Sequence, residues 1–250
     1  MKLKEQLKTF APINLKQMER VKLLRRSDTK YLISKKRVSN LLPYLVQDYF
    51  ILEIDGNRIA SYHTAYLDTP DKTYYKHHHQ GRNKRYKVRF RTYVESYLSF
   101  LEVKLKDKGK TNKKRITSIQ NNFLDDDQKA FLSEWITEDL EQLNISLENT
   151  FQRVTLVHKT NQERVTIDFN LNFVTKNQTI PLDEQVIIEI KQSRVNRNSI
   201  ISKLLRSKLI RPVRLSKYCI GCILMNDGLK YNRFKSKLIK INQIQSVWNF

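Results

Sequence analysis

The chain has 250 residues, of which 40% are hydrophobic and 10% aromatic, so it can form a substantial core and is not a disordered protein. Lysine and arginine number 47 against 25 aspartate and glutamate residues, which gives a formal net charge of +22. Such an excess favours a polyanionic partner: nucleic acid, an anionic membrane or a phosphate-rich small molecule. The placement of the charges has to decide among these partners.

The chain lacks an apolar run near the roughly 20 residues that span a bilayer. Its start, Met1-Lys2-Leu3, is not followed by the apolar stretch of a secretory signal. Five glycines and five prolines leave little material for linkers, so a single domain over 1–250 is the simplest prediction. Two cysteines make no disulfide framework. We therefore expect a cytoplasmic protein, and attachment to a membrane-protein partner is left open.

Hydrophobic periodicity and turn residues predict a mixture of helices and strands. In chain order these are an amphipathic helical lead-in (about 1–24), a strand (26–33), a helix (35–46), strands (58–67, 85–93, 98–106 and 114–119), a helix (125–140), strands (151–158, 164–169 and 186–191), a helix (198–205), a helix or a strand leading into one (216–224), and a basic C-terminal helix (about 229–250). Strands outnumber helices and short turns join most of them. This predicts an antiparallel sheet or barrel decorated with helices.

Charged side chains gather on one face of several predicted strands, because successive side chains of a strand point to opposite faces. In strand 85–93 the opposite face carries Tyr86, Val88 and Phe90. The same division holds in strands 98–106, 164–169 and 186–191. The charged or polar faces carry Arg85, Lys87, Arg89 and Arg91; Glu102, Lys104 and Lys106; Arg164, Thr166 and Asp168; and Glu189 and Lys191.

Any one of these strands fits an ordinary half-buried sheet with a solvated face. Four cations in a row on one face repel each other, however, and a sheet that needed only solubility would interleave acids among them. Arginine and lysine bind phosphate oxygens well. Concentrated cations beside the isolated Glu102 and Glu189 therefore indicate a site for a polyanion and a divalent metal. If the sheet closes, these faces line a polar lumen.

A set of short motifs along the chain resembles one family. In order they are RSDTKY (26–31), YLDTPD (66–71), HHQGR (78–82), KVRFRTY (87–93), EVK (102–104), EIK (189–191) and SKY (216–218). Their joint order resembles the VTC domain, the polyphosphate polymerase domain of the vacuolar transporter chaperone complex, in the triphosphate tunnel metalloenzyme (CYTH-like) superfamily. The resemblance runs from about Arg26 to Gly221. It implies an α+β fold, an antiparallel β-barrel tunnel with a polar, basic lumen, decorated by helices.

The resemblance also implies an activity: transfer of the γ-phosphate of ATP to a growing polyphosphate chain, with Mn²⁺ or Mg²⁺ as cofactor. The residues that it assigns to catalysis are Lys30, Arg89, Arg91, Lys104 and Lys217. Those that it assigns to phosphate binding are Lys114, Arg153, Arg214 and Ser216, and Glu189 matches the metal-binding carboxylate. Two positions depart from the family: Thr166 stands where it has an arginine, and Lys106 stands where the eukaryotic enzyme has a histidine.

Further residues join the predicted site from their place on the charged faces or within the motifs. Glu102 is predicted as a second metal ligand, because carboxylate oxygens suit Mg²⁺ and Mn²⁺. The chain has no P-loop motif, so the phosphates would be held by side chains rather than by a glycine-rich loop. Phosphate binding is predicted for Arg26, Lys87, Lys106, Arg164 and Lys191, and for His78 at the tunnel mouth.

Three other features have plainer structural explanations. Cys219 and Cys222 have the spacing of a metal or redox pair, but no second pair completes a zinc site, so a buried structural pair is predicted. The three histidines at 77–79 are expected in a loop, where consecutive side chains cannot face one ion. The lysine-rich turn 106–114 is predicted to be solvated apart from Lys114 and Lys106.

Four functions stay open at this point. They are polyphosphate synthesis, triphosphate hydrolysis or ATP cyclisation on the same fold, a non-catalytic polyphosphate or inositol-phosphate binding module, and nucleic-acid binding. The last is disfavoured because the basic rows lie opposite apolar rows instead of being interleaved with aromatic residues. We therefore expect ATP, polyphosphate or other triphosphates as partners and no specific nucleic acid. The oligomeric state is not determined by the sequence.

Overall fold

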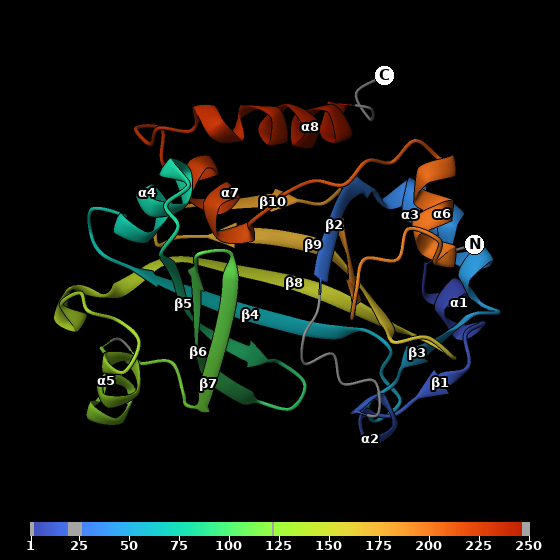
Figure 1. Ribbon diagram of the computed structural model, residues 1–250, viewed down its shortest axis with the longest axis horizontal. Coiled ribbons are helices and arrows are strands. Elements are labelled where there is room, and N and C mark those ends of the chain that lie inside the picture. The colour runs from blue at the N-terminus through green and yellow to red at the C-terminus, as the bar shows by residue number, and fades with distance from the viewer. Residues whose placement is uncertain (1–2, 20–26, 122, 247–250) are drawn as a thin grey trace.

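A strongly curled sheet forms the centre of the molecule, a computed structural model that describes residues 3–19, 27–121 and 123–246 (Figure 1). Neighbouring strands along the sheet are antiparallel, which confirms the predicted α+β fold around an antiparallel sheet. The strand order is β2 (Ser27–Ser34), β11 (Gln185–Gln192), β9 (Glu163–Val174), β8 (Asn144–His158), β4 (Ala60–Asp68), β5 (Arg85–Tyr93), β6 (Leu98–Asp107) and β7 (Lys110–Thr117).

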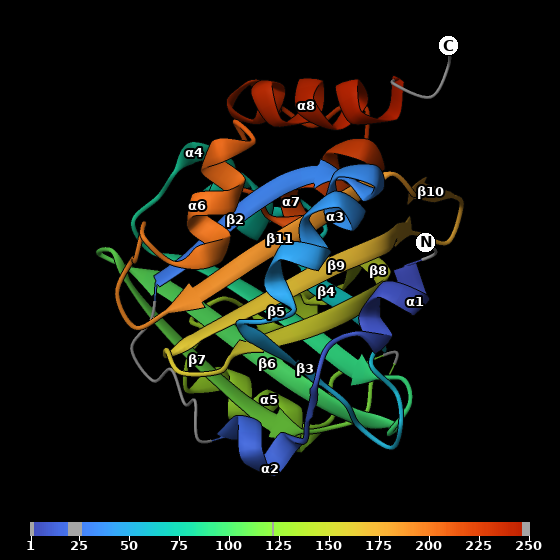
Figure 2. The same cartoon turned by 90° about the vertical axis from the view of Figure 1, so that its right-hand side faces the viewer.

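The sheet is a curled half-barrel (Figure 2). Strands β2 and β7 are the two ends of its order and, in the described residues, they do not pair with each other. Helix α7 (Lys217–Leu224) lies on the concave side, so the lumen is bounded by the curved sheet and this helix. Three short strands that the sequence did not predict extend the sheet: β1 (Pro12–Ile13) pairs in parallel with β3 (Tyr49–Leu52), which pairs with β8, and β10 (Thr179–Leu182) pairs with β9.

Three apolar clusters hold helices against the two faces of the sheet, and burial of this surface is the main stabilising contribution. The outer face of β2, β11, β9 and β8 packs against α1 (Leu3–Lys8), α3 (Lys35–Leu41) and α6 (Ile200–Ser207) (Figure 2). The outer face of β4, β5 and β6 packs against α5 (Asp126–Ser133). On the inner face, α7 and α8 (Lys235–Ser246) cover apolar side chains such as Phe173. The rest of the inner face carries the charged rows.

Local chemistry explains where several helices begin and end. The Asp125 carboxylate accepts the backbone N–H of Gln128 at 2.8 Å and starts α5, as an N-cap should. Helix α3 ends at Leu41 because Pro43, in the 3-10 turn Leu42–Leu45, has no N–H to donate. The predicted helix 35–46 is therefore two pieces. The predicted helix 125–140 likewise ends at Ser133, before a separate 3-10 turn (Leu140–Gln142).

The prediction of a loop for the three histidines is wrong. His77, His78 and His79 lie in α4 (Thr73–Gln80). The Asp68 carboxylate accepts the backbone N–H groups of Tyr74 and Tyr75, at 2.8 and 3.0 Å, and so fixes the first turn of this helix. Gly81 closes it with a φ of 73°, a conformation that favours glycine.

Each end of the chain forms several short elements where the sequence predicted one helix. In place of one helical lead-in there are α1, β1 and the short α2 (Leu15–Met18), and residues 20–26 lie outside the described part. The C-terminal segment begins with a 3-10 turn (Asn232–Phe234) before α8. Across the residues that the structure describes, none of the helices has both the length and the apolar character required to cross a membrane.

Candidate active site

Cations of two neighbouring strands face one another on the inner side of the sheet. The register aligns Lys87 with Lys104 and Arg89 with Glu102, and side chains of aligned residues project from the same face. The alternate residues, such as Val88, are buried in the outer apolar cluster. The division of β5 and β6 into a charged and an apolar face is therefore as predicted from their alternation.

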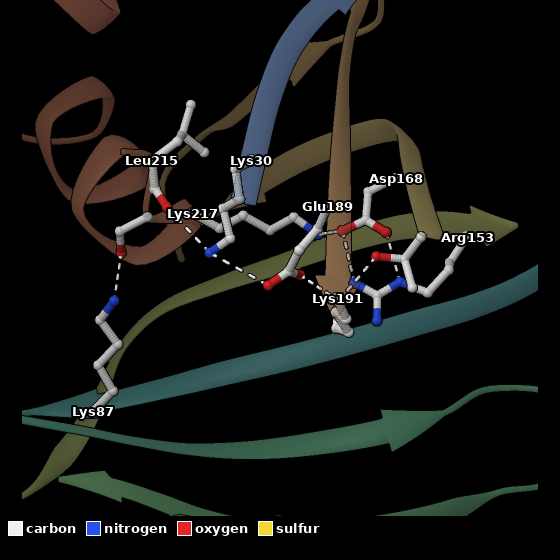
Figure 3. A network of polar contacts seen from close by, with 10 residues as sticks. Lys30, Lys87, Arg153, Asp168, Glu189, Lys191, Leu215 and Lys217 are labelled. Atoms are coloured by element: carbon white, nitrogen blue, oxygen red, sulfur yellow. Dashed lines mark hydrogen bonds and ion pairs between the residues drawn. The ribbon is translucent and has the colours of Figure 1, made fainter. Parts of the chain in front are cut away.

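The opposite wall of the lumen carries a second charged row. Glu189 on β11 is aligned with Lys30 on β2 and with Thr166 on β9. Lys191, two residues further along the same face of β11, is aligned with Arg164 on β9. Figure 3 shows this wall and α7 facing Lys87 across the lumen. The curvature of the sheet thus brings cations from both walls to one space.

Asp168 joins two of the predicted site cations (Figure 3). Its carboxylate accepts two hydrogen bonds from Arg153, Nε to Oδ1 at 2.6 Å and Nη2 to Oδ2 at 2.7 Å. Lys217 Nζ lies 2.6 Å from Oδ2. Asp168 is only 4% exposed, and burial acts to raise its pKa, but the charges of Arg153 and Lys217 hold that pKa well below its ordinary value. An ionised Asp168 therefore fixes the positions of both cations.

Glu189 is engaged less completely. Its Oε2 lies 2.8 Å from Lys191 Nζ, whereas Oε1 is 3.9 Å from Lys30 Nζ. Both lysines have a second acceptor: Lys191 donates to Thr166 Oγ1 at 3.2 Å and Lys30 to the Leu215 carbonyl at 3.4 Å. Although burial acts to raise the pKa of Glu189, Lys191 and Lys30 hold it well below the ordinary value. Glu189 is thus an ionised carboxylate with one oxygen only loosely engaged.

Glu102, which the sequence predicted as a second metal ligand, is engaged more completely than Glu189. Arg89 Nε and Nη2 both approach Oε2, at 2.7 and 2.5 Å, and Lys113 Nζ is 2.5 Å from Oε1. The Glu102 side chain is 2% exposed. Both oxygens are therefore occupied by cations, and Glu102 serves as the counterion that orients Arg89.

Helix α7 carries the SKY motif to the lumen. Ser216 caps the helix, because its Oγ accepts a hydrogen bond from the backbone N–H of Cys219 at 3.3 Å. The same oxygen accepts a hydrogen bond from Lys87 Nζ at 2.9 Å. The Tyr218 hydroxyl donates to Asp68, the carboxylate that also starts α4. Because Asp68 binds both helices, it fixes the position of Ser216 and Lys217 relative to the sheet.

Aromatic rings line the space next to these cations. Tyr62 and Phe151 stack with centroids 5.0 Å apart, and Lys217 Nζ lies 2.9 Å from the Phe151 centroid. The Arg153 guanidinium carbon lies 5.1 and 5.3 Å from the centroids of Tyr62 and Phe151. Burial lowers the pKa of Lys217 well below its ordinary value. The rings thus exclude water while still stabilising positive charge.

Lys87, Arg91 and Lys104 form no ion pair with an acid among the described residues, although Glu102 acts on Arg91, and Asp28 and Glu189 act on Lys104, through their charges. Burial, together with the charges of Lys30 and Lys104, lowers the pKa of Lys87 to about 8. Burial and Arg89 lower the pKa of Arg91 to about 10, which still leaves its guanidinium charged at neutral pH. The Lys104 side chain contacts solvent, yet desolvation by the surrounding walls and the charge of Lys30 lower its pKa as well. These shifts are signs of a concentrated positive potential that an anion would relieve.

One predicted phosphate-binding lysine lies on the wrong face. Lys114 is exposed and is aligned with Val103, whose side chain is in the outer cluster. Lys113, aligned with Lys104, is on the inner face. The two-residue turn Lys108-Gly109, with φ angles of 44° and 85°, sets this register. Of these two lysines, Lys113 rather than Lys114 therefore faces the lumen.

Other predicted residues lie at the edges of the site. Lys106 is aligned with Arg85 on the inner face near the β6–β7 turn, and Arg164 Nη1 lies 3.9 Å from Met18 Sδ. Arg214 is exposed beside the buried Leu215. Arg26 lies outside the described residues.

His78 contacts the strand that carries the basic row. Its Nε2 lies 3.2 Å from the Tyr86 carbonyl, and the His78 pKa is lowered to about 2 by burial and by Lys87 and Arg85. A neutral imidazole is available for hydrogen bonding but adds no charge to the site. The other two histidines of α4 have separate partners, Arg82 for His77 and Asn232 for His79, so the three do not share one ion.

Cys219 and Cys222 are both free and buried on α7. Burial raises the pKa of both thiols, to about 12 for Cys222. Thiols that stay protonated are poor nucleophiles and poor metal ligands. The pair therefore packs α7 against the sheet, as predicted.

A divalent metal fits this site only together with a phosphate ligand. Across the described residues, no group of three or more histidine, cysteine, aspartate or glutamate side chains could hold an ion alone. Mg²⁺ commonly binds through one or two carboxylates together with substrate phosphates. Glu189, with its loosely engaged Oε1, suits that arrangement.

Sequence reasoning left four contributors out of the predicted site: Asp168, Lys113, Asp68 and Tyr218. Asp168 stood on the polar face of its strand, but a carboxylate there does not reveal which cations it binds. Counting outward from the Lys108-Gly109 turn would have found Lys113, since each step from 107/110 pairs one more residue. Asp68 and Tyr218 are 150 residues apart, so only the fold joins them.

A curled antiparallel sheet with a cation-lined concave face defines a tunnel-type protein. The family model of the VTC domain matches residues 25–226, so the chain belongs to the VTC domain family. A candidate adenylate cyclase from Bacillus halodurans is similar in structure, with a TM-score of 0.54 and 13% identity over 77% of this chain and 94% of that one. This likeness shows the fold. A protein from Pyrococcus horikoshii has a TM-score of 0.46 and 12% identity over 80% and 98% of the two chains. A search of curated proteins gives no match.

Proposed function

We propose that the chain is a metal-dependent polyphosphate polymerase that transfers the γ-phosphate of ATP to a growing polyphosphate chain. The observation that carries the proposal is the concentration of cations from both lumen walls around one ionised carboxylate, Glu189, that is loosely engaged on one side. Membership of the VTC domain family supports the same reaction. The free cysteines are compatible with the cytoplasmic location that forms part of the proposal.

Phosphoryl transfer requires the protein mainly to position the substrates and to neutralise their charge. A terminal oxygen of the acceptor chain attacks the γ-phosphorus of ATP, the bond from that phosphorus to the β–γ bridging oxygen breaks, and ADP leaves. Lys87, Arg91 and Lys104, which form no ion pair with an acid among the described residues, would neutralise the phosphate oxygens. Arg153 and Lys217, which Asp168 holds in place, would orient the bound phosphate groups.

Glu189 is the residue that would hold Mn²⁺ or Mg²⁺ together with substrate oxygens. When bound, the metal would neutralise charge that develops on the transferring phosphate. Glu102 would take no part in this, because Arg89 and Lys113 occupy both of its oxygens.

The polymerase proposal is tested by the product that forms from ATP. Purified protein is incubated with ATP and Mn²⁺, and the products are separated into long-chain polyphosphate, inorganic phosphate and cyclic nucleotide. Polyphosphate is expected. Inorganic phosphate alone would make the chain a triphosphatase, and cyclic AMP would make it a cyclase. No product, with tight binding of polyphosphate, would make it a binding module.

A matched pair of lysine variants tests the site. Lys104→Ala should lower tripolyphosphate affinity roughly tenfold to a hundredfold, because a hydrogen bond to a charged group is lost. Lys114→Ala removes the same charge from the outer face and should leave affinity unchanged. Equal effects of the two substitutions, or duplex DNA that displaces tripolyphosphate at moderate salt, would contradict a phosphate site in the lumen.

A further inference from the structure

One arginine of the lumen is held differently from its neighbours. The Nε atoms of Arg89 and Arg153 each donate to a buried carboxylate, at 2.7 Å to Glu102 and at 2.6 Å to Asp168. Arg91 lies two residues from Arg89 on the same face of β5. Its Nε is buried and, among the described residues, has no hydrogen-bond partner.

Two neutral side chains with unpartnered polar atoms lie beside it. Thr64 on β4 is aligned with Arg91 on one side and with Asn149 of β8 on the other, so the three form a row across the inner face. Thr64 and Asn149 are both 0% exposed. Thr64 Oγ1, Asn149 Nδ2 and Asn149 Oδ1 all lack a partner within the described part of the chain.

The Arg91 side chain starts in this row and reaches the next one, in which Tyr62 is aligned with Phe151. Its guanidinium carbon lies 5.7 Å from the Tyr62 centroid and 6.0 Å from the Phe151 centroid. Tyr62 precedes Thr64 by two residues on β4, and Phe151 follows Asn149 by two residues on β8. The guanidinium therefore reaches from β5 across β4 toward β8, next to the row of Thr64 and Asn149 that carries the unpartnered atoms.

The unpartnered atoms specify the chemistry of what joins them. Arg91 Nε is only a donor and Asn149 Oδ1 only an acceptor, while the threonine hydroxyl and the amide group supply further donors. A phosphate oxygen accepts hydrogen bonds but donates none, so it would leave Asn149 Oδ1 unpaired. Water both donates and accepts, and buried water usually bridges polar groups that would otherwise be costly to bury.

We propose that Thr64, Asn149 and Arg91 Nε share a buried site for ordered water, and that this neutral site positions Arg91 without neutralising it. Arg89 and Arg153 share their charge with acids, whereas the charge of Arg91 stays available to the phosphate chain. This role rests on the proposed function, because it assumes that the lumen binds phosphate. Thr64 and Asn149 are thus positioning residues that act through Arg91.

Thr64→Val tests the water site, because valine keeps the shape of threonine and removes its hydroxyl. The melting temperature should fall by roughly 2–4 °C, since the bridging water loses a partner. Tripolyphosphate affinity should fall severalfold as Arg91 loses its support. A melting temperature that is unchanged or higher would mean that the hydroxyl had no partner, and would overturn the proposal.

Asn149→Asp tests the neutrality of the site, because it gives Arg91 the carboxylate that Arg89 and Arg153 already have. Tripolyphosphate affinity should fall about tenfold or more. Asn144→Asp, at the exposed start of the same strand, adds the same charge and should leave affinity unchanged. Affinity equal to wild type in Asn149→Asp would overturn the role given to Arg91. A wild-type protein that does not bind tripolyphosphate would instead contradict the proposed function, and the thermal measurement on Thr64→Val would still test the water site.

Discussion

The two walls of the lumen hold their cations in different ways. In the wall built by β8, β9, β11 and β2, acids accompany the cations: Asp168 binds Arg153 and Lys217, and Glu189 binds Lys191 and approaches Lys30. In the wall built by β5, β6 and β7, Glu102 binds two cations, but three others form no ion pair with an acid among the described residues. These are Lys87, Arg91 and Lys104.

This difference indicates a division of work within one site. Buried ion pairs fix side chains in place, because a charge that leaves its partner in a dry interior becomes costly. Cations without partners keep their full attraction for an incoming anion. The first wall thus supplies geometry and the second supplies affinity, and substitutions in the two walls should affect different measurements.

Asp168→Ala should have the largest effect of these substitutions, and the quantity that it changes is the stability of the fold. It leaves Arg153 and Lys217 buried without their acid, so the free energy of unfolding should fall by about 3–5 kcal/mol in urea titrations. Glu141→Ala is the control, because Glu141 is 71% exposed in its pair with Lys129 and should contribute little to stability. A loss at Asp168 no greater than that of the control would mean that the first wall does not depend on its ion pairs.

Glu189→Gln should act on turnover more than on binding. The amide keeps the shape of the side chain but removes the charge that would hold the metal. Metal-dependent consumption of ATP should fall about a hundredfold, since a metal contributes several kcal/mol and each 1.36 kcal/mol is tenfold in rate. Tripolyphosphate binding without metal should not weaken. Full activity in this variant would remove Glu189 from the proposed metal site.

The pH dependence of binding should come from the second wall. Lys87, with its pKa lowered to about 8, is protonated below that pH and attracts phosphate, and it loses its proton as the pH rises. Tripolyphosphate affinity should therefore decline between about pH 7 and pH 9. Calorimetry on Lys87→Met should give weaker binding at neutral pH and a flatter profile over this range. Parallel profiles for the two proteins would assign the titration to another group, such as Lys191, whose pKa is also lowered to about 8.

The smallest measurable loss of affinity is expected from Lys113→Ala. Lys113 is on the inner face but 39% exposed, and it shares its charge with Glu102, so the affinity loss should stay below about 1 kcal/mol. Lys114→Ala should give no loss at all. If Lys114→Ala weakens tripolyphosphate binding more than Lys113→Ala does, the register between β6 and β7 is not as described.

The sequence predicted those features that depend on local alternation. The strand 85–93 has the predicted bounds, and its charged and apolar faces are the predicted ones, because a period of two residues is visible in the sequence itself. For 216–224 the sequence left a helix or a strand leading into one, and the structure shows the helix α7, which Ser216 caps.

Long-range pairing was beyond the sequence. Asp168 binds Arg153 because β8 and β9 align those two positions, and it binds Lys217 because α7 crosses the concave face. Both acids of the EVK and EIK motifs look alike in sequence. Only the contacts in the folded chain show that cations engage both Glu102 oxygens, while Glu189 Oε1 is loosely engaged.

Four positions from the cap of α7 onward, Ser216, Lys217, Tyr218 and Gly221, have contacts that depend on their spacing along the helix. Ser216, Lys217 and Tyr218 reach three different strands or loops, and a side chain at Gly221 would come closer than 3.0 Å to Leu147 and Phe173. A single inserted residue between them would rotate the later positions by about 100° and separate all these contacts at once. The spacing from serine to glycine should therefore tolerate point changes elsewhere in the helix far better than any change in length.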